Sequence, residues 1–278
     1  MNLCNLTAAA YHLLECAAAH PFDVFLDTLS ILVEAGADGF EAGISELQSK
    51  QIVVLAQERC LLFAHLSYRD AVYENTEASS RRAIHRRWAE TLESASDPPS
   101  LDRFAVLAWH WEHAADGQRA RPCYLAAARA ARKVYAQRDA ERFYRAYLDL
   151  VEVPTAESIQ ARNELAREVL GFGGRLEDQV TEHSRALDEA LRIGDELNAG
   201  RSHALLSLPL LRLGKRDQAL ASVEASLAIA RSVRDRPTEA AALLGLARLF
   251  SDEGRLREAQ GTAAESLAIA RAIGDRQA

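Results

Sequence analysis

Apolar and polar positions over residues 160–278 recur at a fixed interval of 40 residues. The repeating positions are glycines, leucines and aspartates, namely Gly174, Gly214, Gly254, Leu187, Leu227, Leu267, Asp195, Asp235 and Asp275. A fixed interval of this size indicates stacked supersecondary units, not one globular core. We therefore expect a solenoid here, in which no unit buries its apolar face without a neighbour.

Each repeat unit is predicted to be a pair of helices. Leu243, Leu246 and Phe250 fall at helical spacing and give one apolar face. Gly254 ends that helix, because glycine takes the left-handed conformation at little cost. The inward face of the second helix is predicted to carry Ala259, Ala263, Leu267 and Ala270. The preceding copy follows the same plan, with Leu227 as a core position.

This combination of small residues, a glycine turn and alanines resembles the tetratricopeptide repeat in a 40-residue form. The resemblance is strongest over residues 200–273 and weaker over 160–194, where Arg167 and Gln179 stand in place of small residues. It implies an all-α chain with a right-handed solenoid. The concave surface of such a superhelix would bind a protein or peptide.

The N-terminal part has a different order of elements. Helical patterns cover residues 7–19, 22–33 and 40–48, and β-type runs follow at 52–55 and 61–63. Three helices followed by a short hairpin predict a winged-helix-like module. Its third helix carries Glu41 and Glu46, and acidic side chains there disfavour contact with DNA phosphates.

Paired prolines predict the domain boundary. In the segment Asp97–Ser100 the prolines stop one helix and Ser100 can cap the next. We assign residues 1–96 to the winged-helix-like module with its connecting helix, and 100–278 to the solenoid. Degenerate units are expected over 100–159, and clearer units over 160–278. The pattern predicts helices at 101–115, 119–135, 138–151 and 157–171.

Three short sequence motifs make the interpretation of the N-terminal part more specific. They are Phe-Ala-His at 63–65, Arg-Asp-Ala-Val-Tyr at 69–73, and Arg-Ala-Ile-His-Arg-Arg-Trp-Ala at 82–89. In this order, before repeats, they resemble the region after the nucleotide-binding module of bacterial STAND or AAA-like signal-transduction ATPases. Those include maltose-regulator-like proteins and kinase- or cyclase-fused ATPases. The resemblance implies a regulatory region and, in a full-length relative, an upstream nucleotide-binding module.

Composition excludes some functions. The net charge of −7 and pI near 5.7 disfavour nonspecific binding to nucleic acid or anionic membranes. His12 and Glu15 interrupt the first apolar run, and no 18-residue apolar stretch follows, so we expect a cytoplasmic chain. The four cysteines lack metal-ligand spacing and are expected to be reduced and mostly buried: Cys4, Cys16, Cys60 and Cys123.

No catalytic motif is assembled along the chain. Gly214-Lys215 lacks the preceding glycine of a phosphate-binding loop, and Arg216 stands where Ser or Thr is required. We therefore expect no enzyme activity and no cofactor. The sequence stops at Gly274-Asp275-Arg276, where the repeats predict another helix pair, so we expect a fragment or a relative without its ATPase module.

Two clusters have alternative interpretations. The basic residues Arg81, Arg82, Arg86 and Arg87 are expected to be solvated or paired with the acidic first 60 residues. His110 and His113 lie at i and i+3, yet zinc catalysis needs a third ligand and a base, so packing is favoured. His65 and His85 are expected to make structural hydrogen bonds.

The leading hypothesis is a noncatalytic region that binds a protein or peptide through the solenoid. The alternatives are a DNA-binding regulator acting through the winged helix, and the ligand-sensing part of a kinase- or cyclase-linked protein. First helices line the concave face of such repeats, so the predicted partner-binding residues lie there. They are Glu164, Glu168, Arg201, Arg212, Arg248 and Asp252. The resulting charge gradient predicts a peptide with opposite charges at its two ends.

Overall fold

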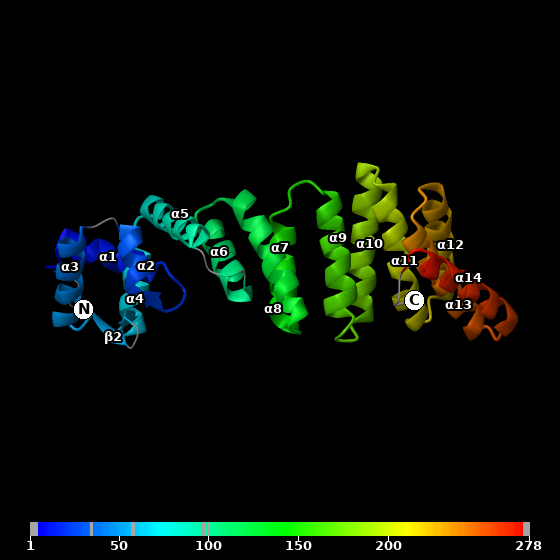
Figure 1. The fold of residues 1–278 in the computed structure, drawn as a ribbon, viewed down its shortest axis with the longest axis horizontal. Helices are drawn as coiled ribbons and strands as arrows, with labels where there is room; N and C mark the ends of the chain where they lie inside the picture. Colours follow the sequence, from blue (N-terminus) through cyan, green and yellow to red (C-terminus); the bar gives the residue numbers. More distant parts are fainter. Residues whose placement is uncertain (1–4, 34–35, 57–58, 96–97, 99, 275–278) are drawn as a thin grey trace. The chain divides into compact units, whose positions relative to one another are not determined.

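The computed structural model describes residues 5–33, 36–56, 59–95, 98 and 100–274. Within them the chain forms two compact units, residues 1–127 and 128–278. The predicted boundary residues Asp97 and Pro99 lie outside the described residues, as do Cys4, Asp275 and Arg276. Figure 1 follows the two units along the chain.

Unit 1 is a bundle of short helices with a small sheet. Its elements are α1 Ala8–Ala18, β1 Val24–Phe25, α2 Leu26–Val33, α3 Ala37–Ser49, β2 Val53–Ala56, β3 Cys60–Phe63, α4 Leu66–Asn75, α5 Ala78–Ser94 and α6 Leu101–His113. Helix α7, Gly117–Lys133, continues into unit 2. The core gathers Leu13, Leu29, Leu47, Ile52 and Trp88, all at most 1% exposed.

The predicted hairpin is confirmed as β2 and β3, which pair antiparallel with Leu55 opposite Leu61. Strand β1 extends the sheet in the order β1-β3-β2. This third strand occupies part of the helix predicted over 22–33, so the helix begins only at Leu26. The strand has two residues, too few for an alternating pattern to be visible in the sequence.

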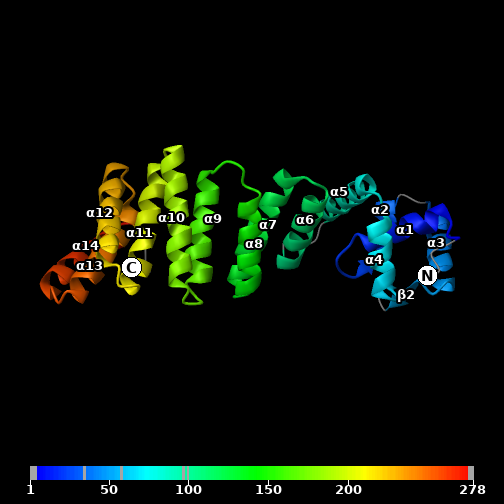
Figure 2. The same ribbon diagram turned by 180° about the vertical axis from the view of Figure 1, so that it is seen from behind.

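Unit 2 is a stack of helix pairs. After α7 come α8 Gln137–Asp149, α9 Ala156–Glu164, η2 Leu165–Leu170, α10 Leu176–Ile193, α11 Glu196–Arg212, α12 Arg216–Ser232, α13 Arg236–Asp252 and α14 Leu256–Ala272. Helix α11 packs on α12 and α13 packs on α14, while α11 and α13 are also neighbours. Figure 2 shows this stacking of α9 to α14 from behind. The expected all-α repeat architecture is confirmed.

The 40-residue repeat has direct counterparts in hydrogen bonds and turns. Ser226 Oγ donates to the Gly200 carbonyl oxygen at 2.8 Å, and Ser266 Oγ donates to the Ala240 carbonyl oxygen at the same distance. Gly214 has φ of 74°, a left-handed conformation that glycine adopts without strain. The Gly214-Lys215 segment is therefore the turn within a helix pair, which matches its place in the repeat.

Leu227 is not a fully buried core residue. It is half-buried and packs against Ala240, Leu243 and Ile269. Val223, one turn earlier in α12, is completely buried at 0% exposed. The repeat register predicted from the sequence is confirmed, but Leu227 is less buried than predicted.

Candidate partner-binding face

The first helices of the repeat pairs in unit 2 are α9 with its continuation η2, α11 and α13. We call their exposed and half-exposed side chains the first-helix face. On α11 and α13 it contains Leu197, Arg201, Leu208, Arg212, Ala241, Leu244, Arg248 and Asp252. All six predicted partner-binding residues lie on these three helical segments.

Glu164 is already engaged within the unit. Its carboxylate accepts hydrogen bonds from Arg129 at 3.0 Å, Tyr144 at 2.9 Å and Gln160 at 3.1 Å, and its side chain is 13% exposed. Burial alone would raise the pKa of this carboxyl, but the hydrogen bonds of Arg129 and Tyr144 outweigh it and lower the pKa. The group is ionised and its charge is compensated.

Glu168 and Arg201 are also ion-paired. Glu168 meets Arg132 at 3.2 Å and contacts Arg167. Arg201 Nε donates to Asp235 Oδ2 at 3.1 Å. Arg129 and Arg132 therefore offset the acidic end that the sequence predicted for the face. Pairing between residues about one repeat apart in sequence cannot be read from the pattern of a single helix.

Arg212, Arg248 and Asp252 are exposed, and no ion pair involves them in the part of the chain that the structure describes. With the 40-residue offset, Arg248 corresponds to Leu208, and Asp252 corresponds to Arg212. Because α11 and α13 are neighbours, the two arginines lie on adjacent helices about one turn apart. Two exposed arginines against one exposed carboxylate, Asp252, leave this end of the face with a net positive charge, and exposed Leu244 on α13 adds apolar surface.

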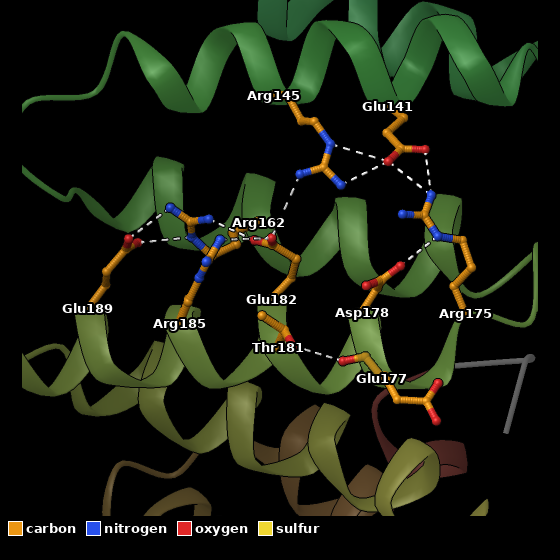
Figure 3. Close-up of polar contacts among 10 residues, drawn as sticks. All are labelled: Glu141, Arg145, Arg162, Arg175, Glu177, Asp178, Thr181, Glu182, Arg185 and Glu189. Carbon is orange, nitrogen blue, oxygen red and sulfur yellow. Dashed lines mark hydrogen bonds and ion pairs between the residues drawn. The ribbon is translucent and has the colours of Figure 1, made fainter. Parts of the chain in front are cut away.

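A network of charged side chains joins helices α8, α9 and α10 (Figure 3). Arg162 on α9 donates to Glu182 at 2.7 Å and to Glu189 at 2.9 Å, both on α10. Glu141 on α8 accepts from Arg175 and Arg145 at 2.8 Å each. Glu182 has only 6% of its side chain exposed, so this network joins helices instead of presenting charge to a partner.

Replacing Arg162 should be costly. Arg162→Met leaves the buried Glu182 carboxylate with weaker partners, so we expect a loss of about 3 kcal/mol in the free energy of unfolding, measured by urea denaturation. Arg185→Met is the matched control, because Arg185 is 60% exposed and surface pairs contribute at most about 1 kcal/mol. Equal losses of unfolding free energy for the two variants would mean that Arg162 is not the main partner of the Glu182 carboxylate.

Polar residues also join the repeats in the interior, which the sequence did not indicate. His183 Nδ1 lies 2.7 Å from Asn163 Oδ1, and Asn163 Nδ2 donates to Ser202 Oγ at 2.9 Å. Burial lowers the pKa of His183 to about 3, so its ring is neutral. Buried hydrogen bonds of this kind hold α9, α10 and α11 in one register.

The histidine predictions have mixed outcomes. His85 is buried and makes structural hydrogen bonds to Tyr73 and His110, as expected. His65 is exposed at the start of α4, and its ring contacts Tyr68 but makes no side-chain hydrogen bond among the described residues, so that prediction was wrong. The chain leaves β3 at Phe63, and His65 is an exposed residue before α4. His110 is buried and bonds to His20 and His85, whereas His113 bonds to the Trp109 carbonyl.

The remaining clusters are structural. Arg81 donates to the Tyr73 carbonyl at 3.0 Å, and Arg86 lies 3.9 Å from Asp116. These two arginines therefore contact residues beyond the first 60, while Arg82 and Arg86 are exposed, in line with a solvated face. Cys16 and Cys60 are buried as expected, and burial raises the pKa of the Cys16 thiol to about 12. Cys123 is half-buried.

The comparisons with known proteins agree with the repeat architecture. Residues 203–272 match the family model described as tetratricopeptide repeat. This part of the chain, α11 to α14, is a tetratricopeptide repeat region, a class that generally binds proteins. No curated protein matches the sequence. In the described residues no helix is both long and apolar enough to cross a membrane.

Three solved structures are similar to the chain. Aspartyl phosphate phosphatase F from Bacillus subtilis has 10% identity and a TM-score of 0.54, over 99% of this chain and 78% of that one. A putative kinesin light chain with nearly identical TPR-like repeats from Podosopora anserina has 16% identity and a TM-score of 0.52, over 72% and 99%. At these identities the likeness concerns the fold alone.

The third is a Signal Transduction ATPase with Numerous Domains (STAND) protein with a tetratricopeptide repeat sensor, from Pyrococcus horikoshii. It has 16% identity and a TM-score of 0.48 over 98% of this chain. The chain spans 45% of the length of that protein.

Proposed function

We propose that this chain is a noncatalytic regulatory region that binds a protein or peptide through the first-helix face. The observation that carries the proposal is the pair Arg212 and Arg248, two exposed cations without a described ion pair on adjacent first helices of a tetratricopeptide repeat region. Leu244, 37% exposed and one turn from Arg248 on α13, provides apolar surface. This surface suits a segment with acidic and apolar side chains.

We further propose that the chain belongs to a signal-transduction ATPase of the STAND type. This proposal is supported by the order of the helices and strands and by the three sequence motifs at 63–65, 69–73 and 82–89. In that setting, a partner on the repeats would shift the equilibrium of a nucleotide-binding module by binding one of its states more tightly. A DNA-binding role for unit 1 is less favoured, because Glu41 and Glu46 are on α3.

The basic character of the face predicts the partner. An unbiased peptide-display selection should enrich sequences with Asp or Glu near large apolar residues. For a selected peptide, Arg212→Glu with Arg248→Glu should weaken binding at least about tenfold in calorimetry, since each lost charge-assisted contact contributes about 1.5–3 kcal/mol.

The matched control for that pair is Arg192→Glu with Arg257→Glu. These arginines are exposed on the second helices α10 and α14, so the net charge changes equally without touching the face. Circular dichroism should show all variants folded. If the two double variants weakened peptide binding equally, binding would depend on overall charge and the first-helix face would not be the binding site.

The chain alone is expected neither to bind nor to hydrolyse ATP. Its nearest approach to a phosphate-binding loop, Gly214-Lys215, is a repeat turn, and Arg216 there donates to the Leu249 carbonyl at 3.0 Å. A thermal-shift titration with Mg-ATP should leave the midpoint unchanged. A nucleotide-dependent rise that persists in Lys215→Glu would reveal a nucleotide site elsewhere.

A further inference from the structure

Unit 1 contains a cleft of about 1130 Å³. It opens between the end of α1, the β1–β3 edge of the sheet, the start of α4, and helices α5 and α6. The residues that matter for its chemistry are His20, Phe22, Phe25, Leu66, Arg69 and Trp88. Its volume is sufficient for a small organic molecule.

Large apolar side chains form much of the lining of this cleft and are open to solvent. Phe22 is 65% exposed, Phe25 is 49% exposed and Leu66 is 72% exposed, although all three are large apolar side chains. Trp88, 1% exposed, contributes to the lining from the core side. Several exposed apolar side chains on one cleft mark a binding site more than scattered ones do.

Arg69 and His20 are two of the polar side chains that line the cleft, together with Asp23, Asp102 and Arg103. Arg69 has one weak hydrogen bond, from Nε to the Ala18 carbonyl at 3.4 Å, and no ion pair in the described parts of the chain. His20 stacks on Trp88, with ring centroids 4.4 Å apart. Its Nδ1 lies 3.0 Å from His110 Nε2, so Nε2 is the ring nitrogen left for a ligand.

His20 ends a chain of hydrogen bonds with a single direction. His110 Nδ1 lies 3.0 Å from His85 Nδ1, and His85 Nε2 lies 2.9 Å from Tyr73 Oη. If the Tyr73 hydroxyl donates to His85, each neutral ring receives on one nitrogen and donates from the other. His20 then presents Nε2–H to the cleft. A ligand that accepts a hydrogen bond beside Arg69 would stabilise this orientation of the chain, in which His20 Nε2 carries the proton.

We propose that the cleft binds an organic monocarboxylate with an aromatic or aliphatic body. The carboxylate lies between Arg69 and His20, and the body covers Phe22, Phe25 and Leu66. A guanidinium in an apolar setting favours a carboxylate over a neutral group because of the charge-assisted hydrogen bond. The exposed carboxylates Asp23 and Asp102 also line the cleft and disfavour ligands with several negative charges.

A matched pair of probes tests this proposal on the full chain. 4-Phenylbutyrate and 4-phenyl-1-butanol share the same body and differ in charge, and both are titrated by NMR and calorimetry. The acid should bind at least about tenfold more tightly than the alcohol. Arg69→Gln should abolish the preference, whereas Arg82→Gln, an exposed arginine on α5 outside the cleft, should keep it.

A second variant locates the body of the ligand. Leu66→Ser should weaken both probes together, and its wild-type exposure of 72% makes misfolding a small concern. Equal affinity for acid and alcohol in the wild type would overturn the proposal. So would an unchanged preference in Arg69→Gln, or binding of both probes that Leu66→Ser leaves intact.

Discussion

Acidification from pH 7 to pH 5 should destabilise unit 1 more than unit 2. Burial lowers the pKa of His20 to about 4 and, together with His113 and Arg81, lowers the pKa of His85 to about 3. Burial also takes the pKa of His110 well below its usual range. Unit 2 contains His183, with a pKa near 3, and half-buried His203, whose pKa is lowered by burial.

The sign follows from proton uptake. A histidine with a lowered pKa in the folded state gains a proton on unfolding once the pH is below about 6.5, so stability is lost as the pH falls through that value. The loss is about 1.4 kcal/mol per pH unit per histidine until the folded pKa is reached. At pH 5, His20 and His85 together therefore remove about 4 kcal/mol from unit 1, and His110 adds to this. His183 removes about 2 kcal/mol from unit 2.

The measurement can separate the units, because all three tryptophans, Trp88, Trp109 and Trp111, are in unit 1. Urea unfolding followed by tryptophan fluorescence should show a midpoint that falls steeply between pH 7 and pH 5. Far-UV circular dichroism, dominated by the helices of both units, should retain a transition at higher urea. His20→Gln should reduce the pH dependence of the fluorescence midpoint. An unchanged midpoint at pH 5 would contradict the buried neutral cluster.

Much of the fold was predictable because it depends on local patterns. The 40-residue interval gave the helix pairs of unit 2, since each unit contacts mainly its neighbours. The glycine at position 214 indicated a turn because only a left-handed residue fits there. Strand β1 was missed because its two residues pair with β3 across more than 30 positions of sequence.

The candidate site was less predictable, because charge pairing is a long-range property. Glu164 and Arg212 both look like charged residues of a first helix. In the structure, Arg129 compensates Glu164, while Arg212 is left without a described ion pair. The histidine cluster shows the same limit, since His20 and His110 are 90 positions apart in sequence and only tertiary packing brings them together.

The second large effect is expected at Val223, in the middle of α12. This side chain is 0% exposed and packs with Leu206, Leu210 and Leu249. Gly245 on α13 comes so close that a Cβ atom there would lie 3.1 Å from Val223 Cγ2. The neighbourhood has no room to turn a polar group toward water.

Val223→Asp should therefore remove about 5 kcal/mol from the free energy of unfolding of unit 2, against about 2 kcal/mol for Val223→Ala. The alanine variant loses packing, whereas the aspartate variant also buries a carboxylate without a partner. A loss of that size is comparable with the whole stability of many domains. Urea unfolding followed by circular dichroism measures it, and tryptophan fluorescence checks that unit 1 still unfolds at its own midpoint.

Two aspartate variants on the same helix complete the series. Ala228→Asp is the control, because Ala228 is exposed and surface substitutions change stability by at most about 0.5 kcal/mol. Leu227→Asp should fall between the two, since the half-buried carboxylate can reach water by a rotamer change. The order Val223, Leu227, Ala228 in lost stability maps the inward face of α12 directly. If Leu227→Asp were as damaging as Val223→Asp, the helix would be rotated about its axis from the orientation described here.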